Sequence, residues 1–173
     1  MLGWGFADFF VKKTVDEIGD VVTAVWAHVF GTIALAVIFL YQWFAHADRL
    51  AFPVNASAWS IVIGFGVLQA IVYLLVYKGF GKGQVTVLSP IFASFSGLTA
   101  LFSILFFNEI VPVQAFLALA LIFVGILLVN VDLQAIRFRR LDFLHVPGFK
   151  EIGVATLLAA VWTLFWDQVV GGQ

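Results

Sequence analysis

The chain has 173 residues, of which 63% are hydrophobic and only 11% are charged. Soluble domains are about 45–50% apolar and about 25% charged, so a soluble protein with a wettable surface is excluded, and the lipid bilayer is the first expected partner. The net charge of −1 provides no basic field for nucleic acid, and the absence of cysteine excludes disulfides, thiolate zinc sites and thiol catalysis.

Long uncharged windows locate the membrane spans. No Asp, Glu, Lys or Arg occurs in 21–47, 50–77, 83–108 or 110–131, and each window exceeds the about 18 residues that mark a transmembrane candidate. Two further apolar segments carry a carboxylate each, namely Asp8 and Asp167. We predict an all-α, polytopic transmembrane helix bundle of about six helices, near 2–13, 21–45, 58–77, 84–107, 112–131 and 151–170.

Basic residues gather in alternate links between these helices. The links after the second and fourth predicted helices hold only Arg49, so the positive-inside rule places the other links in the cytoplasm and the N-terminus outside. The third link, KGFGKGQ, is expected to be a tight turn, and it lacks the Gly-Lys-Ser/Thr ending of a phosphate loop. The basic residues of the first, third and fifth links are Lys12, Lys13, Lys78, Lys82, Arg137, Arg139, Arg140 and Lys150.

The predicted helix 84–107 combines hydroxyl groups with apolar bulk on one face. Small residues on such a face allow another helix to approach closely in lipid, which is the simpler interpretation. The alternative is that the face lines a polar path. Pro90 favours this alternative, because it leaves a backbone carbonyl without its helical partner, and broken backbone at membrane depth often borders a binding cavity. The residues of this face are Thr86, Ser89, Ala93, Ser96, Ala100 and Ser103.

A second polar stripe follows the predicted helix 58–77, where Gly66, Gln69, Tyr73 and Tyr77 share one face. An amide in hydrocarbon needs a partner. Either Gln69 bonds to another helix while the tyrosines anchor the interface, or Gln69 and Tyr73 contact a substrate. In the predicted helix 21–45, His28 is either a satisfied interior residue or a proton carrier.

Carboxylates at membrane depth are costly, at about 2.5–3.5 kcal/mol each near the midplane. Asp8 lies one turn from both Trp4 and Lys12, so an Asp8–Lys12 pair is the simpler explanation and coupling to an ion or proton is the alternative. Asp167 is a second candidate coupler. Glu109 ends a predicted helix and is expected to reach water or a neighbouring helix.

Two stretches resemble a known family. WGFADFFVKK (4–13) resembles the opening of the first helix of EamA-type transporters, which belong to the drug/metabolite transporter superfamily. The stretch 77–130 resembles the signature of their third to fifth helices, in which a glycine-containing turn precedes a Ser/Ala-Pro helix that ends in glutamate. An apolar helix with a late glycine follows. The matching positions are Pro90, Glu109, Gln114 and Gly125.

The resemblance implies ten helices in two inverted five-helix repeats, and secondary transport of small metabolites. Residues 1–131 would be one EamA repeat, 132–150 a basic cytoplasmic linker, and 151–173 the first helix of an incomplete second repeat, because Trp162 and Asp167 echo Trp4 and Asp8. The chain departs from the family pattern in its short first helix, its expected outside N-terminus, its end after six helices, and His28, where relatives often carry arginine.

We therefore expect a multi-pass plasma-membrane transporter that moves a small-molecule substrate by alternating access. No nucleophile–base arrangement or metal cluster is recognisable in the sequence, so no enzyme activity, metal or cofactor is expected. Two other classes stay open: a small exporter active only as a homodimer, and a non-transporting membrane fragment or assembly subunit. The expected substrate pathway is Gln69, Tyr73, Ser89, Pro90 and Ser96, and the candidate ion or proton couplers are Asp8, His28 and Asp167.

Overall fold

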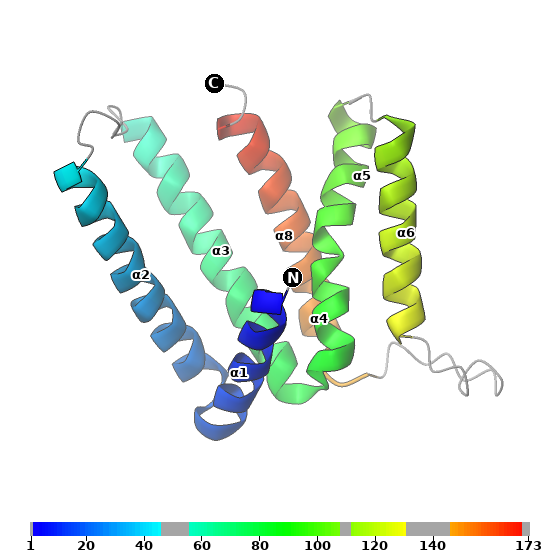
Figure 1. Ribbon diagram of the computed structural model, residues 1–173, viewed down its shortest axis with the longest axis horizontal. Coiled ribbons are helices and arrows are strands. Elements are labelled where there is room, and N and C mark those ends of the chain that lie inside the picture. The colour runs from blue at the N-terminus through cyan, green and yellow to red at the C-terminus, as the bar shows by residue number, and fades with distance from the viewer. Residues whose placement is uncertain (1, 46–55, 108–111, 131–145, 171–173) are drawn as a thin grey trace.

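The computed structural model describes residues 2–45, 56–107, 112–130 and 146–170, and all of its regular structure in these ranges is helical (Figure 1). Four segments are long and apolar enough to cross a membrane, which confirms the predicted all-α membrane bundle: Asp20–Ala45, Ala58–Lys82, Val85–Phe107 and Phe149–Trp166. The helices are α1 (Leu2–Ile18), α2 (Asp20–Ala45), α3 (Ala56–Lys82), α4 (Val85–Ala93), α5 (Phe95–Phe107), α6 (Val113–Asn130) and α8 (Phe149–Val170).

Two predicted helix ends are wrong. Helix α1 continues to Ile18, so Lys12 and Lys13 lie within it rather than in a link. Helix α3 continues to Lys82 through most of the glycine-containing stretch that was expected to be a turn. The helix persists there because its end is packed against α4 and α8, and such tertiary contacts override the low helix propensity of glycine.

A junction of three glycines joins α3, α4 and α8. A Cβ atom at Gly79 would lie 2.7 Å from Ile152 Cγ1, and one at Gly83 would lie 2.1 Å from the carbonyl oxygen of Pro147. Gly148 has a φ of +84° and would place a Cβ 2.4 Å from the carbonyl oxygen of Gly79. Because backbone meets backbone here, only glycine fits. We call Gly79, Gly83 and Gly148 the glycine junction.

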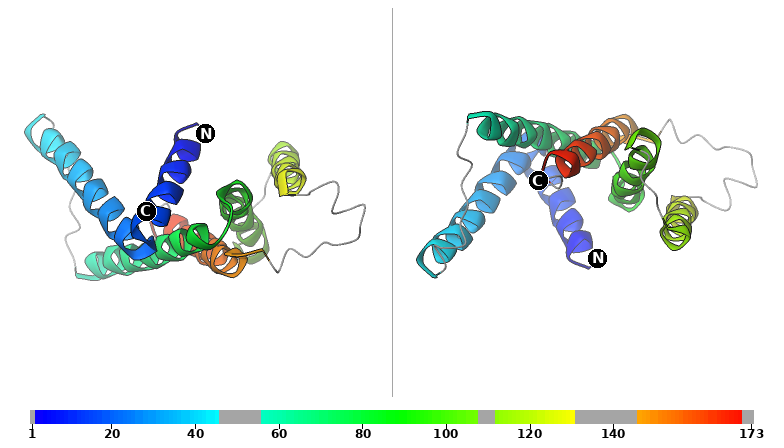
Figure 2. Two further views of the ribbon diagram at one scale, coloured as in Figure 1. Left: turned by 90° about the horizontal axis from the view of Figure 1, so that it is seen from below. Right: turned by 90° about the horizontal axis from the view of Figure 1, so that it is seen from above.

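The corner between α1 and α2 is made by Gly19, whose φ of +88° is a conformation that residues with a Cβ rarely adopt. The Gly19 N–H donates to the Val15 carbonyl at 2.9 Å, and the Gly19 carbonyl accepts from the Thr23 N–H at 3.1 Å. One residue therefore ends α1 and starts α2. The two helices diverge from this corner as a V on the same side of α3 (Figure 2).

The predicted helix 84–107 is broken at Ser94, which separates α4 from α5. The Ile91 carbonyl accepts hydrogen bonds from the Ser94 N–H at 3.2 Å, from the Ser94 hydroxyl at 2.6 Å and from the Thr156 hydroxyl of α8 at 3.4 Å. These donors take the place of the backbone N–H that would bond the Ile91 carbonyl in an unbroken helix. The backbone can therefore bend at Ser94, one turn after Pro90. The small-residue face is therefore divided: Ser89 meets α1, Ser96 is exposed and Ser103 is buried.

Helix α8 lies between α3 and α5 and holds the bundle together (Figure 1). The Trp162 indole N–H donates to the Phe65 carbonyl at 3.1 Å, and the Thr99 hydroxyl reaches the Ala160 carbonyl at 3.3 Å. Among the described helices, α2 packs only against α1 and α3, and α6 only against α4 and α5. The buried core is consequently centred on α3 and α8, with α2 and α6 as outer arms.

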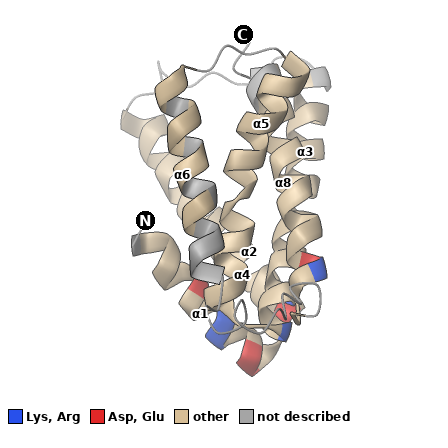
Figure 3. Ribbon diagram, turned by 90° about the vertical axis from the view of Figure 1, so that its right-hand side faces the viewer, with Lys and Arg blue, Asp and Glu red and all other residues tan. Residues whose placement is uncertain are grey.

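The described charged side chains lie at one end of the bundle (Figure 3). That end contains the α1–α2 corner, the α3–α4 link and the start of α8, as the predicted alternation of basic links requires. Lys82 pairs with Glu151 across the glycine junction. Arg49, Arg137, Arg139 and Arg140 lie outside the described residues.

Candidate functional site

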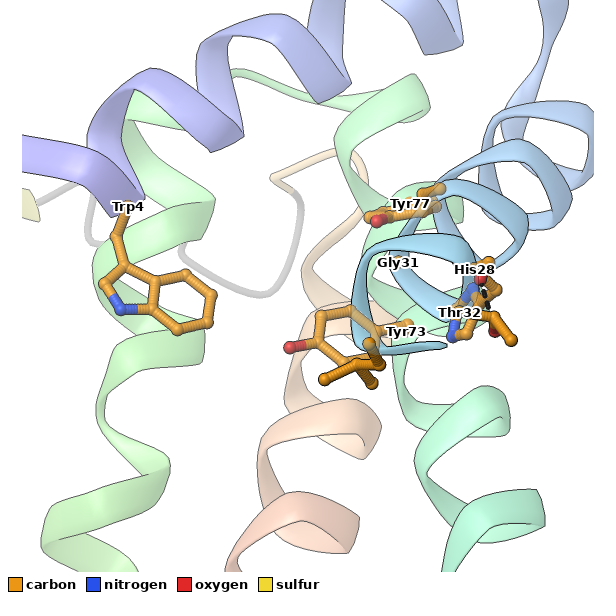
Figure 4. Close-up of a pocket in the computed structure, with 8 residues that line it drawn as sticks. Trp4, His28, Gly31, Thr32, Tyr73 and Tyr77 are labelled. Carbon is orange, nitrogen blue, oxygen red and sulfur yellow. Dashed lines mark hydrogen bonds between the residues drawn. The ribbon is translucent and has the colours of Figure 1, made fainter. Parts of the chain in front are cut away.

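An open cavity of about 480 Å³ lies between α1, α2 and α3 (Figure 4). The Trp4 ring of α1 faces Tyr73 of α3 across the open space, and α2 forms the remaining wall. Ligand pockets typically enclose about 300–1,000 Å³, so the volume suits a small organic molecule. The lining residues are Trp4, Ala27, His28, Gly31, Thr32, Leu35, Tyr73 and Tyr77.

Helix geometry brings these side chains together. On α2, the lining residues recur at intervals of three and four, so they share one face. Four of the five are small or polar, which keeps the space open. On α3, Tyr73 and Tyr77 are one turn apart with ring centroids separated by 6.1 Å. Tyr77 is buried in the core, so the aromatic wall is fixed to the rigid part of the bundle.

His28 is held in one orientation. Its Nδ1 lies 2.7 Å from the Ala24 carbonyl oxygen. Since a carbonyl only accepts, Nδ1 must carry the proton of this hydrogen bond. The ring also meets Tyr73 edge to face, with centroids 5.9 Å apart and an interplanar angle of 77°. No described residue bonds the other nitrogen, Nε2, which is left to a ligand or to water.

Asp8 lies at the margin of the cavity, one turn after Trp4 on α1. Its half-buried carboxylate accepts a hydrogen bond from the Ser89 hydroxyl of α4. Burial raises the pKa of the Asp8 carboxyl, and the Ser89 hydrogen bond opposes this effect. The alternative Asp8–Lys12 pair is wrong, because Lys12 pairs with Asp16 at 2.6 Å.

The structure brings together some of the residues predicted from the sequence. His28 and Tyr73 both line the cavity, and Gln69 lies one turn before Tyr73 on the same face of α3. Ser89 is tied to Asp8, and Pro90 follows it inside α4.

The other predicted residues lie apart from the cavity or beyond the described atoms. Ser96 is exposed on α5, where its hydroxyl bonds the Ala93 carbonyl of its own chain at 3.2 Å, and α8 separates α5 from α3. Glu109 lies outside the described residues. Asp167 belongs to α8, but its side chain is outside the described part.

Six lining residues were not singled out as site residues from the sequence: Trp4, Ala27, Gly31, Thr32, Leu35 and Tyr77. The sequence does contain a pattern that could have identified the lining residues of α2. These residues have the spacing of one helix face and include a glycine and an alanine. Trp4 could not have been identified, because only the fold shows that α1 turns back at Gly19 and brings its N-terminal half in front of α3.

The chemistry of this site is that of binding. The cavity offers three aromatic side chains, two of which carry phenol hydroxyls, together with one imidazole and the Thr32 hydroxyl. The Asp8 carboxylate lies one turn from Trp4. Within the described ranges, no group of three His, Asp or Glu residues could hold a metal ion. The residues therefore suit recognition of an organic ligand.

One comparison with known proteins gives a match. A model of the EamA-like transporter family matches residues 1–131. No curated protein and no solved structure matches the chain. The matched range contains α1, α2 and α3, and hence the whole lining of the cavity.

Proposed function

Because the chain belongs to the EamA-like transporter family, as the resemblance predicted, we propose that it is a secondary transporter for a small metabolite. The cavity between α1, α2 and α3 is its substrate site, and alternating access exposes that site to each side in turn. The observation that carries the proposal is an open, aromatic cavity of about 480 Å³ with walls from α2 and α3, which are both long and apolar enough to span a membrane. The plasma membrane is the proposed location.

The packing suggests which parts would move. Helices α3 and α8 share the buried core, whereas α2 contacts only α1 and α3 among the described helices. The Gly19 corner joins α1 and α2 without side-chain bulk. Rocking of the α1–α2 pair against α3 and α8 would widen or close the cavity, because its lining is divided between these two parts.

Of the three candidate groups for coupling to an ion or proton, we propose Asp8 first. It is half-buried, touches α4 through Ser89, and has no basic partner within the described residues. His28 is a second candidate, since it lines the cavity and leaves Nε2 to a ligand. Asp167 remains a proposal from the sequence.

Substitution of Tyr73 tests whether the cavity carries substrate. We expect Tyr73→Leu to lower initial uptake roughly tenfold, which corresponds to about 1.4 kcal/mol of lost binding, in a counterflow screen of proteoliposomes with amino acids, sugars and cationic dyes. The control is Tyr41→Leu on α2, where the tyrosine is exposed and does not line the cavity. Equal uptake by the two variants would remove Tyr73 from the site.

Assembly state is a separate proposal. We propose the homodimer as one candidate for the active form, and the non-transporting subunit as the competing outcome. Crosslinking in detergent at low protein concentration distinguishes a dimer from a monomer. A monomer that shows no counterflow with any substrate would favour the non-transporting subunit.

A further inference from the structure

We propose that the cavity between α1, α2 and α3 recognises a monovalent organic cation that carries an alkylated ammonium or an equivalent soft positive charge. This inference names the substrate class of the site and therefore rests on the proposed function. It follows from the aromatic lining, from the charge around the cavity and from its size.

The aromatic lining is the first observation. Trp4, Tyr73 and Tyr77 come from two helices and face one open space (Figure 4). Aromatic faces attract cations through their quadrupole, and indole does so most strongly. Trp4 is 65% exposed in the structure, so its ring is available to a ligand rather than used in the core. Several rings around one cavity are the arrangement by which proteins hold alkylated ammonium groups.

The charge around the cavity is the second observation. No Lys or Arg lines it. The nearest basic residue along α1, Lys12, is paired with Asp16. Asp8, in contrast, lies one turn after the lining residue Trp4 on α1, and no described basic side chain pairs with it. An anionic ligand would meet a carboxylate and no cationic partner, whereas a cationic ligand would meet a counter-charge beside the cavity.

The volume of the cavity favours an organic cation over a metal ion. A space of about 480 Å³ is far larger than a metal ion needs, and no three metal-binding side chains converge among the described residues. The polar groups of the lining are few, namely the His28 imidazole, the Thr32 hydroxyl and the two phenols, while Ala27, Gly31 and Leu35 are apolar. A ligand with a diffuse charge and an apolar body suits such walls.

A binding experiment tests the charge preference directly. The full chain in detergent is titrated with radiolabelled tetraphenylphosphonium, which is then displaced by three competitors of the same shape class: benzyltrimethylammonium, its uncharged carbon analogue neopentylbenzene, and phenylmethanesulfonate. We expect benzyltrimethylammonium to compete at least about tenfold better than the neutral analogue. This ratio lies within the about 2- to 30-fold gain in affinity that one cation–π contact contributes. The sulfonate is expected not to compete.

A matched pair of tryptophan variants links the binding to this cavity. Trp4→Leu is expected to weaken tetraphenylphosphonium binding about 2- to 30-fold. Trp26→Leu is the control, because Trp26 is exposed on α2, stacks on Phe30 and does not line the cavity. Both variants must elute as the unmodified protein does in size-exclusion chromatography. Equal loss in the two variants, or none in Trp4→Leu, would place the cation elsewhere and overturn the inference.

The outcome also distinguishes this inference from the proposed function. The cation preference is wrong if the neutral or anionic competitor displaces the probe as well as the cation does. It is also wrong if only uncharged metabolites show counterflow that depends on Tyr73. In the second case the proposed transport function is still supported. If no substrate shows counterflow but the cation binds through Trp4, the cavity is a cation site in a protein that does not transport.

Discussion

The Asp8→Asn variant is expected to lose uptake by about 30-fold or more while remaining folded. Removing one charge from a desolvated pair costs about 2–5 kcal/mol. The pair here is the one that Asp8 would form with a bound cation or coupling ion, and the lower end applies because Asp8 is only half-buried. Asparagine keeps an oxygen that can accept the Ser89 hydrogen bond, so the contact between α1 and α4 is retained. Initial rates in proteoliposomes measure the effect.

Asp16→Asn is the matched control for this variant. Asp16 lies two turns later on the same helix, where it is exposed and paired with Lys12. An exposed ion pair contributes about 0–1 kcal/mol to stability, so uptake should change little. If Asp8→Asn transports as well as Asp16→Asn, Asp8 has no part in coupling or in substrate recognition.

The same variant should alter how stability depends on pH. Because burial raises the pKa of Asp8 in the folded protein, the unfolded chain releases this proton at a lower pH than the folded chain does. The free energy of unfolding therefore falls as pH rises from the ordinary carboxyl pKa to the raised one. Thermal unfolding in detergent across this range should show a smaller decline in Asp8→Asn. If the free energy of unfolding declines equally in Asp8→Asn and in the unmodified protein, another titrating group causes the decline.

The Gly83→Ala variant is expected to be strongly destabilised by a single added methyl group. The added Cβ would stand 2.1 Å from the Pro147 carbonyl oxygen and 2.8 Å from Leu88 Cδ1. Leu88 is fully buried, so the start of α8 would have to move away from α3. Overpacking of this kind costs about 1–3 kcal/mol and occasionally more. Unfolding by sodium dodecyl sulfate in mixed micelles measures the loss.

Gly64→Ala in the middle of α3 is the control for the glycine junction. A Cβ there meets nothing within 4 Å, and alanine is favoured over glycine inside a helix by about 0.5–1 kcal/mol. The two substitutions add the same methyl group to neighbouring parts of the chain, with opposite expected signs. If Gly83→Ala is as stable as Gly64→Ala, the close approach of α3 to α8 is not present in the protein.

The fold could be predicted from the sequence wherever charge and hydropathy decide it. Three of the four candidate spans overlap the uncharged windows, since a charge in hydrocarbon costs far more than local propensity contributes. The fourth, Phe149–Trp166, contains Lys150 and Glu151 and was expected from its apolar composition instead. The end of α3 and the break at Ser94 depend on tertiary contacts instead: Gly83 meets Pro147, and the Ile91 carbonyl binds Thr156 of α8. Neither contact leaves a signal within a single helix.

The candidate site was predictable only in part, for the same reason. His28 and Tyr73 were singled out because polar groups at membrane depth need partners, and both line the cavity. Ser96 was grouped with Ser89 by helical spacing, but Ser96 is exposed on α5, and α5 packs against α8 rather than α3. Trp4 became a site residue only through the turn at Gly19.

Cysteine accessibility across one turn of α2 tests whether the cavity is a water-filled path among lipid-covered helices. The chain contains no cysteine, so Thr32→Cys and Ile33→Cys each introduce a single thiol. Thr32 lines the cavity, whereas Ile33 is 54% exposed outside it. In proteoliposomes, a water-soluble maleimide should label the Thr32→Cys variant and leave Ile33→Cys unlabelled. Equal labelling of both variants, or labelling of Ile33→Cys alone, would contradict a wet cavity within a membrane bundle.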